Sequence, residues 1–266
     1  MTAIQSLLLG ILQGVAEFLP ISSSGHLVLL RRLMNLGQVP LLYDVLLHIS
    51  TLIVVVIVFR SRIGSVFTSI WRAVKSTTGP GDRENLRLTL YILIATAVTG
   101  AVGFVLSRFE ALFFNRPRLV SVLFLVTALF LLSTLLRRGR RDYLQIGFLG
   151  AVLVGLAQGI GVLPGISRAG ITISVALLLG LDRQRSGEFS FLIAIPAILG
   201  ALILQLREAG NLLEIVDPAT LLVGFGASFV IGLLSLILLL RVVRRGQLAV
   251  FSIYLVPLSV ISFILL

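Results

Sequence analysis

The chain has 266 residues, of which 58% are hydrophobic and only 12% are charged, and its mean hydropathy is +1.10. Such a composition lies far outside the range of soluble globular domains and is typical of a polytopic membrane protein. The lack of cysteine excludes disulfides, thiolate metal sites and cysteine nucleophiles, and the net charge of +11 comes from short basic clusters between apolar runs, which argues against nucleic-acid binding.

The first apolar region covers about residues 2–35 and is broken in its middle by proline, serine and glycine. The break reads Gln13-Gly-Val-Ala-Glu-Phe-Leu-Pro-Ile-Ser-Ser-Ser-Gly-His26. Neither half is long enough to cross a bilayer, which takes roughly 20 residues. We therefore predict a re-entrant helical hairpin, whose irregular tip is tolerated at membrane depth only inside protein or beside a watery cavity. The region has no basic n-region, so we read it as part of the mature fold and not as a signal peptide.

Three spanning helices are predicted next, at about residues 42–59, 89–106 and 119–136, because each stretch is long and apolar enough to cross a bilayer. The 60–88 connection is predicted to be a surface loop that carries a short interfacial helix with Trp71.

A second broken region follows at about residues 144–181, and its break repeats the first one. It reads Gln158-Gly-Ile-Gly-Val-Leu-Pro-Gly-Ile-Ser-Arg-Ala-Gly-Ile-Thr172, so a Gln-Gly pair again precedes Leu-Pro and the spacing from glutamine to the later glycine is unchanged. We predict a second re-entrant hairpin here. Three more spanning helices follow, at about residues 189–206, 219–240 and 248–266.

The basic residues indicate the orientation of the chain. Most of the 22 lysines and arginines fall on the side of the 60–88 connection, which the positive-inside rule places in the cytoplasm, so both termini are expected outside. Three spans separate the two hairpins, and the second hairpin must therefore enter from the opposite side. The sequence thus predicts one membrane domain, residues 1–266, made of two inverted-topology repeats, about 1–140 and 141–266.

The predicted fold class is an all-α polytopic membrane protein with six transmembrane helices and two re-entrant helical hairpins. In transport folds, inverted repeats place a site near the membrane midplane where the repeats meet. We expect the two hairpin tips to touch there.

The first tip carries a glutamine and a carboxylate in apolar surroundings. Gln13 and Glu17 are four residues apart and share one helix face. Gln13 is explained equally well as a packing amide between helices or as a substrate ligand. Glu17 is costly at membrane depth unless a cation, an arginine or a metal accompanies it, so we assign it a functional role.

Three serines and a histidine complete the first tip. Ser22, Ser23 and Ser24 precede an apolar run, so they are expected to cap the returning helix and, with its first N–H groups, to offer an anion site. His26 would lie in the first turn of that helix. It is either a structural histidine with satisfied partners or an acid/base or nucleophile beside the serines.

The second tip adds a cation. Arg168 opens a helix and can place two donors on a phosphate or a carboxylate; the alternative is a structural ion pair with the carboxylate of the first tip. Ser167 and Thr172 add hydroxyl donors, and Gly165 and Gly170 let a ligand approach the backbone closely. The two tips together suit a phosphoryl group, with a divalent cation on the carboxylate and a histidine or serine as the attacking group.

Polar residues at the ends of the predicted spans carry weaker signals. His48 lies near the outer end of a span, and we interpret it as a packing residue. Asp182, Arg183 and Glu188 lie at the start of another span, where helix capping and matching of the helix dipole explain them.

Two classes of function fit such a pocket. One is hydrolysis of a phosphoryl substrate, and the other is a transporter or lipid flippase, because inverted repeats with broken helices are also transporter architecture. The acid/base and nucleophilic groups at both tips favour hydrolysis, since a carrier would need only the anion clamp.

Three motifs resemble the undecaprenyl pyrophosphate phosphatases of the bacitracin-resistance type. Gln13 and Glu17 with the following Phe-Leu-Pro-Ile-Ser-Ser-Ser-Gly-His are similar to the first signature of that family, and Pro164 to Thr172 is similar to the second. The segment from Glu188 to Pro196 also resembles the family, and the likeness covers nearly the whole chain. One position departs, because Ala169 stands where the family has a serine.

The resemblance implies an enzyme of the bacterial inner membrane that removes the terminal phosphate of undecaprenyl pyrophosphate. This reaction recycles the lipid carrier of cell-wall peptidoglycan synthesis, with help from Mg²⁺ or Ca²⁺. The active site is expected to face the outer, periplasmic side, and a homodimer is compatible with the sequence. The catalytic residues are expected to be Glu17, which would also bind the metal, Ser23, His26 and Arg168. The substrate-binding residues are expected to be Gln13, Ser22, Ser24, Gly165, Ser167, Gly170 and Thr172.

Overall fold

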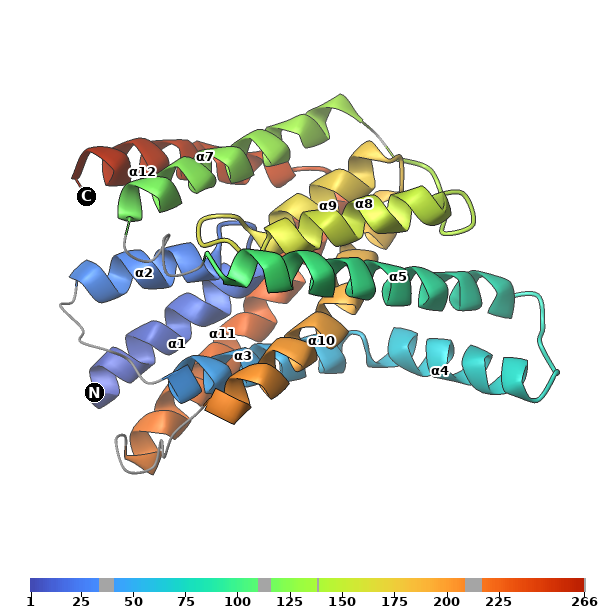
Figure 1. The fold of residues 1–266 in the computed structure, drawn as a ribbon, viewed down its shortest axis with the longest axis horizontal. Helices are drawn as coiled ribbons and strands as arrows, with labels where there is room; N and C mark the ends of the chain where they lie inside the picture. Colours follow the sequence, from blue (N-terminus) through green and yellow to red (C-terminus); the bar gives the residue numbers. More distant parts are fainter. Residues whose placement is uncertain (34–40, 110–115, 138, 209–216, 266) are drawn as a thin grey trace.

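The computed structural model describes residues 1–33, 41–109, 116–137, 139–208 and 217–265. Within these ranges the regular structure is helical, apart from one isolated bridge between Arg141 and Leu181. The helices pack into one bundle (Figure 1). They are α1 (Ala3–Phe18), α2 (Ser23–Leu33), α3 (Leu41–Val58), α4 (Arg60–Val74), α5 (Asp82–Ser107), α7 (Pro117–Ser133), α8 (Gly147–Ile160), α9 (Arg168–Leu178), α10 (Arg183–Glu208), α11 (Pro218–Arg245) and α12 (Ser252–Leu265), with short 3-10 helices η1 (Thr134–Leu136) and η3 (Leu248–Phe251).

The all-helical membrane fold predicted from the sequence is confirmed, with a qualification on the number of spans. In the described ranges, five helices are long and apolar enough to cross a bilayer. A sixth span is present if α3 and α4, which are bent by 71° at their junction, are counted as one. The protein is therefore a multi-pass membrane protein.

Two spanning helices begin earlier than the apolar stretches suggested. α5 begins at Asp82 and not near residue 89, and α10 begins at Arg183 and not near residue 189. An apolar stretch marks only the part of a helix that lies in lipid. These two helices continue for further polar turns, whose side chains pair with neighbouring elements at the end of the bundle.

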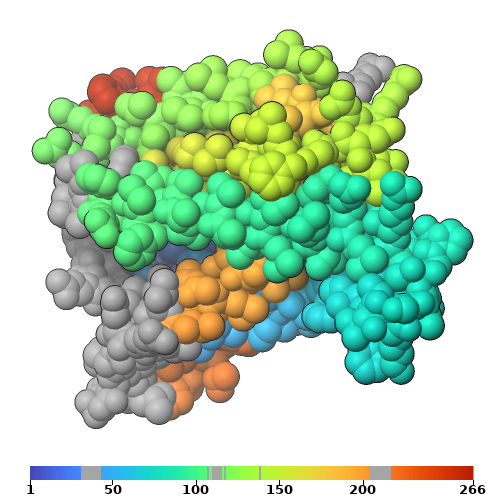
Figure 2. Space-filling model, turned by 45° about the vertical axis from the view of Figure 1, so that its right-hand side comes forward, coloured from blue at the N-terminus to red at the C-terminus, as the bar shows by residue number. Residues whose placement is uncertain are grey.

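The interfacial helix predicted in the 60–88 connection is present as α4, with 15 residues. Three of its apolar side chains are exposed, namely Phe67, Trp71 and Val74 at 66%, 61% and 75%. α4 and the start of α5 project from one end of the molecule (Figure 2). An amphipathic helix with exposed aromatic residues in this position is suited to lie in the membrane interface.

The two broken regions form helical hairpins that enter the bundle from opposite ends (Figure 1). In the first, α1 ends at Phe18 and α2 begins at Ser23; in the second, α8 ends at Ile160 and α9 begins at Arg168. Both chain termini lie at the end from which the first hairpin enters. The helical hairpins and the common end of the termini agree with the sequence analysis, while the inverted repeat stays a prediction.

Each hairpin packs against a long helix from the other half of the chain through glycine. On α1, Gly10 and Gly14 lie against α11, and a methyl group on Gly14 would meet backbone atoms of Gly232 and Ser228 at 2.8 Å. On α8, Gly155 and Gly159 lie against α5. Small residues four apart allow helix backbones to approach closely, which is the main source of attraction between helices in lipid. The matching glycines support the internal repeat, because each pair holds the same position relative to the repeated Gln-Gly motif.

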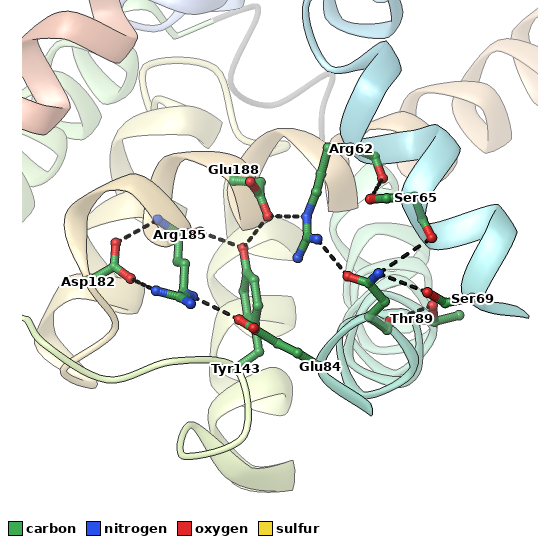
Figure 3. Close-up of polar contacts among 10 residues, drawn as sticks. Arg62, Ser65, Ser69, Glu84, Thr89, Tyr143, Asp182, Arg185 and Glu188 are labelled. Atoms are coloured by element: carbon green, nitrogen blue, oxygen red, sulfur yellow. Dashed lines mark hydrogen bonds and ion pairs between the residues drawn. The ribbon is translucent and has the colours of Figure 1, made fainter. Parts of the chain in front are cut away.

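A polar network connects α4, α5, α10 and the segment before α8 at the end of the bundle where α4 lies (Figure 3). Arg62 donates Nε to Glu188 Oε1 at 2.6 Å and Nη1 to Asn85 Oδ1 at 2.6 Å. Tyr143 donates its hydroxyl to the same Glu188 oxygen at 3.0 Å. Arg185 bridges Glu84 and Asp182.

The interpretation of Glu188 as a residue that only matches the helix dipole was therefore wrong. Its carboxylate contacts two other elements, and it does so because α10 continues past the apolar core to meet α4 and the segment that carries Tyr143. Asp182 does cap α10, accepting the backbone N–H of Arg185 at 3.0 Å.

Candidate active site

The tips of the two hairpins touch, as the sequence analysis expected. Gly165 in the second tip donates its backbone N–H to Ser22 Oγ in the first tip at 3.1 Å, across 143 positions of sequence. Thr127 on α7 holds the second tip from the other side, because its hydroxyl donates to Gly165 O at 2.9 Å and accepts from Ser167 N at 3.0 Å. The irregular backbone at membrane depth thus has protein partners, which is the condition for its stability there.

Two residues of the tips have left-handed backbone conformations. Gly165 has φ +98°, and a side chain there would also collide with the backbone of Val120, so only glycine fits. Ser22 has φ +73°, which is uncommon for a residue other than glycine. Its buried hydroxyl also accepts the N–H of Gly25 at 3.4 Å. Ser22 is thus a residue that joins the tips, in a backbone conformation of the kind that clusters at functional sites.

The carboxylate of Glu17 is the centre of the site. It is buried at the end of α1, and its Oε1 is paired with Nη2 of Arg168 at the start of α9. Its other oxygen, Oε2, accepts a hydrogen bond from Ser23 Oγ at 2.8 Å and one from Gln13 Nε2 at 3.1 Å. The expectation that Glu17 needs a cation as company is confirmed, and the cation is an arginine from the opposite hairpin.

Arg168 lies where the sequence placed it, at the first position of a helix. Ser167 is the N-cap of α9, and its hydroxyl accepts the backbone N–H of Gly170 at 3.1 Å. The side chain of Arg168 is 20% exposed. Among the residues that the structure describes, its Nη2 is the one atom of the guanidinium in a hydrogen bond, so further donors remain for an anion.

His48 also lies beside the carboxylate, a contact that its interpretation as a packing residue did not include. Its Nε2 lies 3.7 Å from Glu17 Oε2, while its Nδ1 lies 2.8 Å from the carbonyl oxygen of Asp44. Because a carbonyl only accepts, Nδ1 carries the proton and Nε2 faces the site. Asp44 and His48 are four residues apart on one face of a span, and this spacing was the only signal in the sequence that His48 could lie at the site.

His26 is near the site but apart from the carboxylate. Its Nδ1 donates to Ser22 O at 2.8 Å, and its Nε2 lies 2.8 Å from the hydroxyl of Tyr254 on α12. Its ring stacks on the ring of Tyr254 and meets the edge of Phe124. Both nitrogens therefore have partners other than Glu17 and Arg168 in the described part of the chain. This geometry matches the structural alternative for His26, and Tyr254 is a partner that the sequence gave no reason to select.

The remaining predicted residues make other contacts than those to the carboxylate of Glu17. Thr172 is fully buried, and its hydroxyl donates to Arg168 O at 2.7 Å and lies 2.5 Å from Ser190 Oγ on α10. Gly170 lies against Pro20, where a methyl group would approach the proline ring to 3.2 Å. Ser24 is partly buried and follows Ser23 in the first turn of α2.

Few side chains around Glu17 could bind a divalent cation. Within the described ranges no three acidic, histidine or cysteine side chains lie close enough together to hold a metal. Gln13 Oε1, however, is buried without a hydrogen-bond partner. A carboxylate and an amide oxygen are donors that Mg²⁺ and Ca²⁺ accept when the substrate phosphates and water complete the shell. The donors present therefore fit a cation that is bound together with a substrate.

The arrangement can perform nucleophilic chemistry on an anionic group. The hydroxyl of Ser23 is in contact with a carboxylate that can accept its proton, and Arg168 with the first turn of α9 supplies positive potential for developing negative charge. Since the carboxylate of Glu17 is buried, its electrostatic interactions are stronger than they would be in water.

The sequence comparisons agree with the geometry. Residues 6–261 match the family model of bacitracin resistance protein BacA. An undecaprenyl-diphosphatase of Treponema denticola is 43% identical over 97% of this chain and 96% of its own. One of Desulfosudis oleivorans is 41% identical over 96% and 95% of the two chains, and one of Korarchaeum cryptofilum is 40% identical over 94% of each. The chain therefore belongs to the BacA family of bacitracin resistance proteins.

Proposed function

We propose that this protein is an integral membrane phosphatase that hydrolyses undecaprenyl pyrophosphate to undecaprenyl phosphate and inorganic phosphate. The cluster of Arg168, Glu17 and Ser23 at the meeting point of the two hairpins carries this proposal. The names of the relatives support the substrate, and family membership over nearly the whole chain supports the transfer of the activity.

The substrate is bound at both of its ends. Its pyrophosphate lies at the start of α9, where the unpaired donors of Arg168 and the first backbone N–H groups of the helix bind phosphate oxygens. Its prenyl chain lies along the apolar surface of the spans, where it keeps the hydrocarbon surroundings that it has in the bilayer.

Ser23 is the attacking group in this proposal. Its Oγ forms a bond to the terminal phosphorus while Glu17 Oε2 takes its proton, and the bond between that phosphorus and the bridging oxygen breaks. Undecaprenyl phosphate leaves with the electron pair. Glu17 passes that proton to the leaving undecaprenyl phosphate, which frees its carboxylate. Water then attacks the phosphoserine. Glu17 takes one proton from the water and gives it to Ser23 Oγ as the bond between phosphorus and Oγ breaks, which releases inorganic phosphate and restores the serine hydroxyl. Arg168 offsets the charge on the phosphoryl oxygens throughout.

A divalent cation would be held by Glu17 and Gln13 Oε1 together with the substrate. When bound, it supplies additional neutralisation of the pyrophosphate charge. Gln13 would then serve as a ligand as well as a donor to the carboxylate, which accounts for its buried and otherwise unpaired oxygen.

We place the protein in the bacterial inner membrane with the termini on the outer face. The first hairpin, which provides Glu17 and Ser23, enters from the end of the termini. The basic loops lie at the other end, which the positive-inside rule assigns to the cytoplasm. Hydrolysis is therefore proposed on the outer side.

The test is phosphate release from undecaprenyl pyrophosphate by protein purified in detergent, with and without a chelator. We expect release by the wild type and a loss of at least about 10²-fold in Ser23→Ala. Ser174→Ala is the matched control, because Ser174 is a buried serine of the second hairpin whose hydroxyl has no partner. Release in detergent distinguishes hydrolysis from transport, since a micelle has no two sides. Wild-type rates in Ser23→Ala would overturn the assignment of the nucleophile, and an inactive wild type would overturn the function.

A further inference from the structure

A groove lies outside the active site, at the end of the bundle where α4 and α5 meet. It has a volume of about 460 Å³ and is lined by Thr78, Gly79, Arg83, Leu86, Arg87 and Leu90. The last four residues have the spacing i, i+3, i+4 and i+7, so α5 presents arginine and leucine on one face. None of these residues takes part in the proposed reaction.

The two arginines of the groove have no counter-ion. Arg83 and Arg87 are exposed, and neither has an acidic partner among the residues that the structure describes. The nearest carboxylates in sequence are engaged elsewhere, because Asp82 binds Ser69 and the N–H of Gly79, and Glu84 pairs with Arg185. Arg83 also lies in the first turn of α5, where the helix dipole disfavours a cation. The positive charge of the groove is therefore available to an external anion.

The other half of the groove is apolar and continues into the membrane-spanning part of α5. Leu90 is 49% exposed and Leu93, one turn further, is 63% exposed. Across the α4–α5 connection, Trp71 is exposed on α4 with the ammonium of Lys75 4.6 Å from its ring centre. Tryptophan and basic residues in this arrangement are typical of the headgroup level of a bilayer. An amphiphile with its head at the arginines would thus have its chain on the leucines.

We propose that this groove binds an anionic phospholipid of the bilayer. Arg83 and Arg87 bind the phosphate and the charged headgroup, and one acyl chain follows Leu86, Leu90 and Leu93 along α5. Basic residues next to a span attract anionic lipid by about 1 kcal/mol each, and two arginines on one helix face give that attraction a defined position. The lipid holds the start of α5 and the connection that precedes it at the membrane surface.

The test is native mass spectrometry of the whole protein in detergent, titrated with phosphatidylglycerol or phosphatidylcholine, combined with thermal unfolding. We expect retained phosphatidylglycerol and a rise in Tm that phosphatidylcholine does not give. In the double variant Arg83→Gln/Arg87→Gln, we expect at least about tenfold weaker binding of phosphatidylglycerol, which follows from two charges at about 1 kcal/mol each.

The control is Arg244→Gln/Arg245→Gln, which removes the same charge from exposed arginines at the end of α11. The end of α11 lies beside Arg183, at the same end of the bundle as the groove. Equal losses in both double variants would show a general charge effect and overturn the site. Equal binding of both lipids would also overturn the site. So would an equal rise in Tm with inorganic phosphate alone, because the ligand would then be a free anion and not a lipid. Leu90→Asn tests the chain separately: weaker phosphatidylglycerol binding with unchanged Tm of the lipid-free protein is expected, and unchanged binding would contradict the acyl path.

Discussion

At the scale of single residues, the site depends on a buried carboxylate whose two oxygens both have polar or charged partners. Glu17 is paired with Arg168 and accepts hydrogen bonds from Ser23 and Gln13. A buried ion pair contributes little net stability, because desolvation offsets the attraction, but removing one partner leaves an uncompensated charge in a medium of low dielectric constant. The presence of such a pair is therefore better explained by function than by stability.

Removing the charge of Glu17 while keeping its shape is the most direct test of its role as a base. In Glu17→Gln the amide cannot take the proton of Ser23, so we expect phosphate release to fall by about 10²- to 10⁴-fold. The protein should still insert, because the amide oxygen can accept from Arg168 while the amide NH₂ group donates to the Ser23 hydroxyl, which can also accept. Release from undecaprenyl pyrophosphate by the purified variant measures this, and a loss below about fivefold would contradict the assignment.

His48 provides a second test at this scale. If it positions the carboxylate through its polar edge, His48→Leu should lower kcat by about tenfold, or ~1.4 kcal/mol, with KM changed little, and His48→Gln should recover part of the rate. If His48 only packs, leucine would be tolerated as well as glutamine. Steady-state kinetics of the two variants therefore decides between a positioning and a packing role.

The residues show what sequence reasoning could and could not reach. Glu17 and Arg168 were predictable because charged groups at membrane depth are costly in any fold. His48 and Tyr254 were not, because each acquires its role from a contact between distant elements that no local pattern records. Thr172 matched a motif, but helix α9 turns its hydroxyl toward Ser190 on α10.

At the scale of elements, the hairpins were predictable and the ends of the long helices were not. Proline, glycine and serine interrupt the apolar runs in both hairpins, and the breaks fall at those positions. The polar first turns of α5 and α10 carry no apolar periodicity, so their helical state follows from tertiary pairing. The 71° bend between α3 and α4, in contrast, falls at residue 59, where the sequence analysis ended the span and began the 60–88 connection.

The packing of α1 on α11 predicts a sharp dependence on glycine. In Gly14→Ala the new methyl group would lie 2.8 Å from backbone atoms of Gly232 and Ser228, which cannot move aside without separating the helices. We expect a loss of about 1–3 kcal/mol, read as a lower Tm in detergent. Gly100→Ala is the control, since nothing lies within 4 Å of that position, and there we expect no loss. Equal Tm values for the two variants would show that α1 and α11 are not in close contact.

At the scale of the whole molecule, the end of the bundle opposite the termini is held by the network around Glu188 (Figure 3). Burial raises the pKa of the Tyr143 hydroxyl well above its ordinary value of 10.0, and the neighbouring Glu188 raises it further. The folded protein therefore keeps this proton at a pH at which the unfolded chain loses it. The contribution of this hydroxyl to the free energy of unfolding is fully present below pH 10.0 and declines as the pH rises above that value.

A comparison of wild type with Tyr143→Phe measures this decline. At about pH 8 the variant should have the lower Tm, because it lacks the hydrogen bonds to Glu188 and Arg185 O. At about pH 11 the difference in Tm should be smaller, since only the wild type suffers ionisation of this hydroxyl in its unfolded state. A difference that stays constant or grows between the two pH values would show that the network does not hold a protonated tyrosine.

The pairing of Glu17 with Arg168 has a consequence for the biosynthesis of the protein. The two residues are 151 positions apart, so a ribosome that adds about 5–20 residues per second makes the arginine roughly 8–30 s after the glutamate. During that interval the first hairpin has neither its counter-charge nor α11 to pack on. The first hairpin therefore completes its packing only after most of the chain has been made.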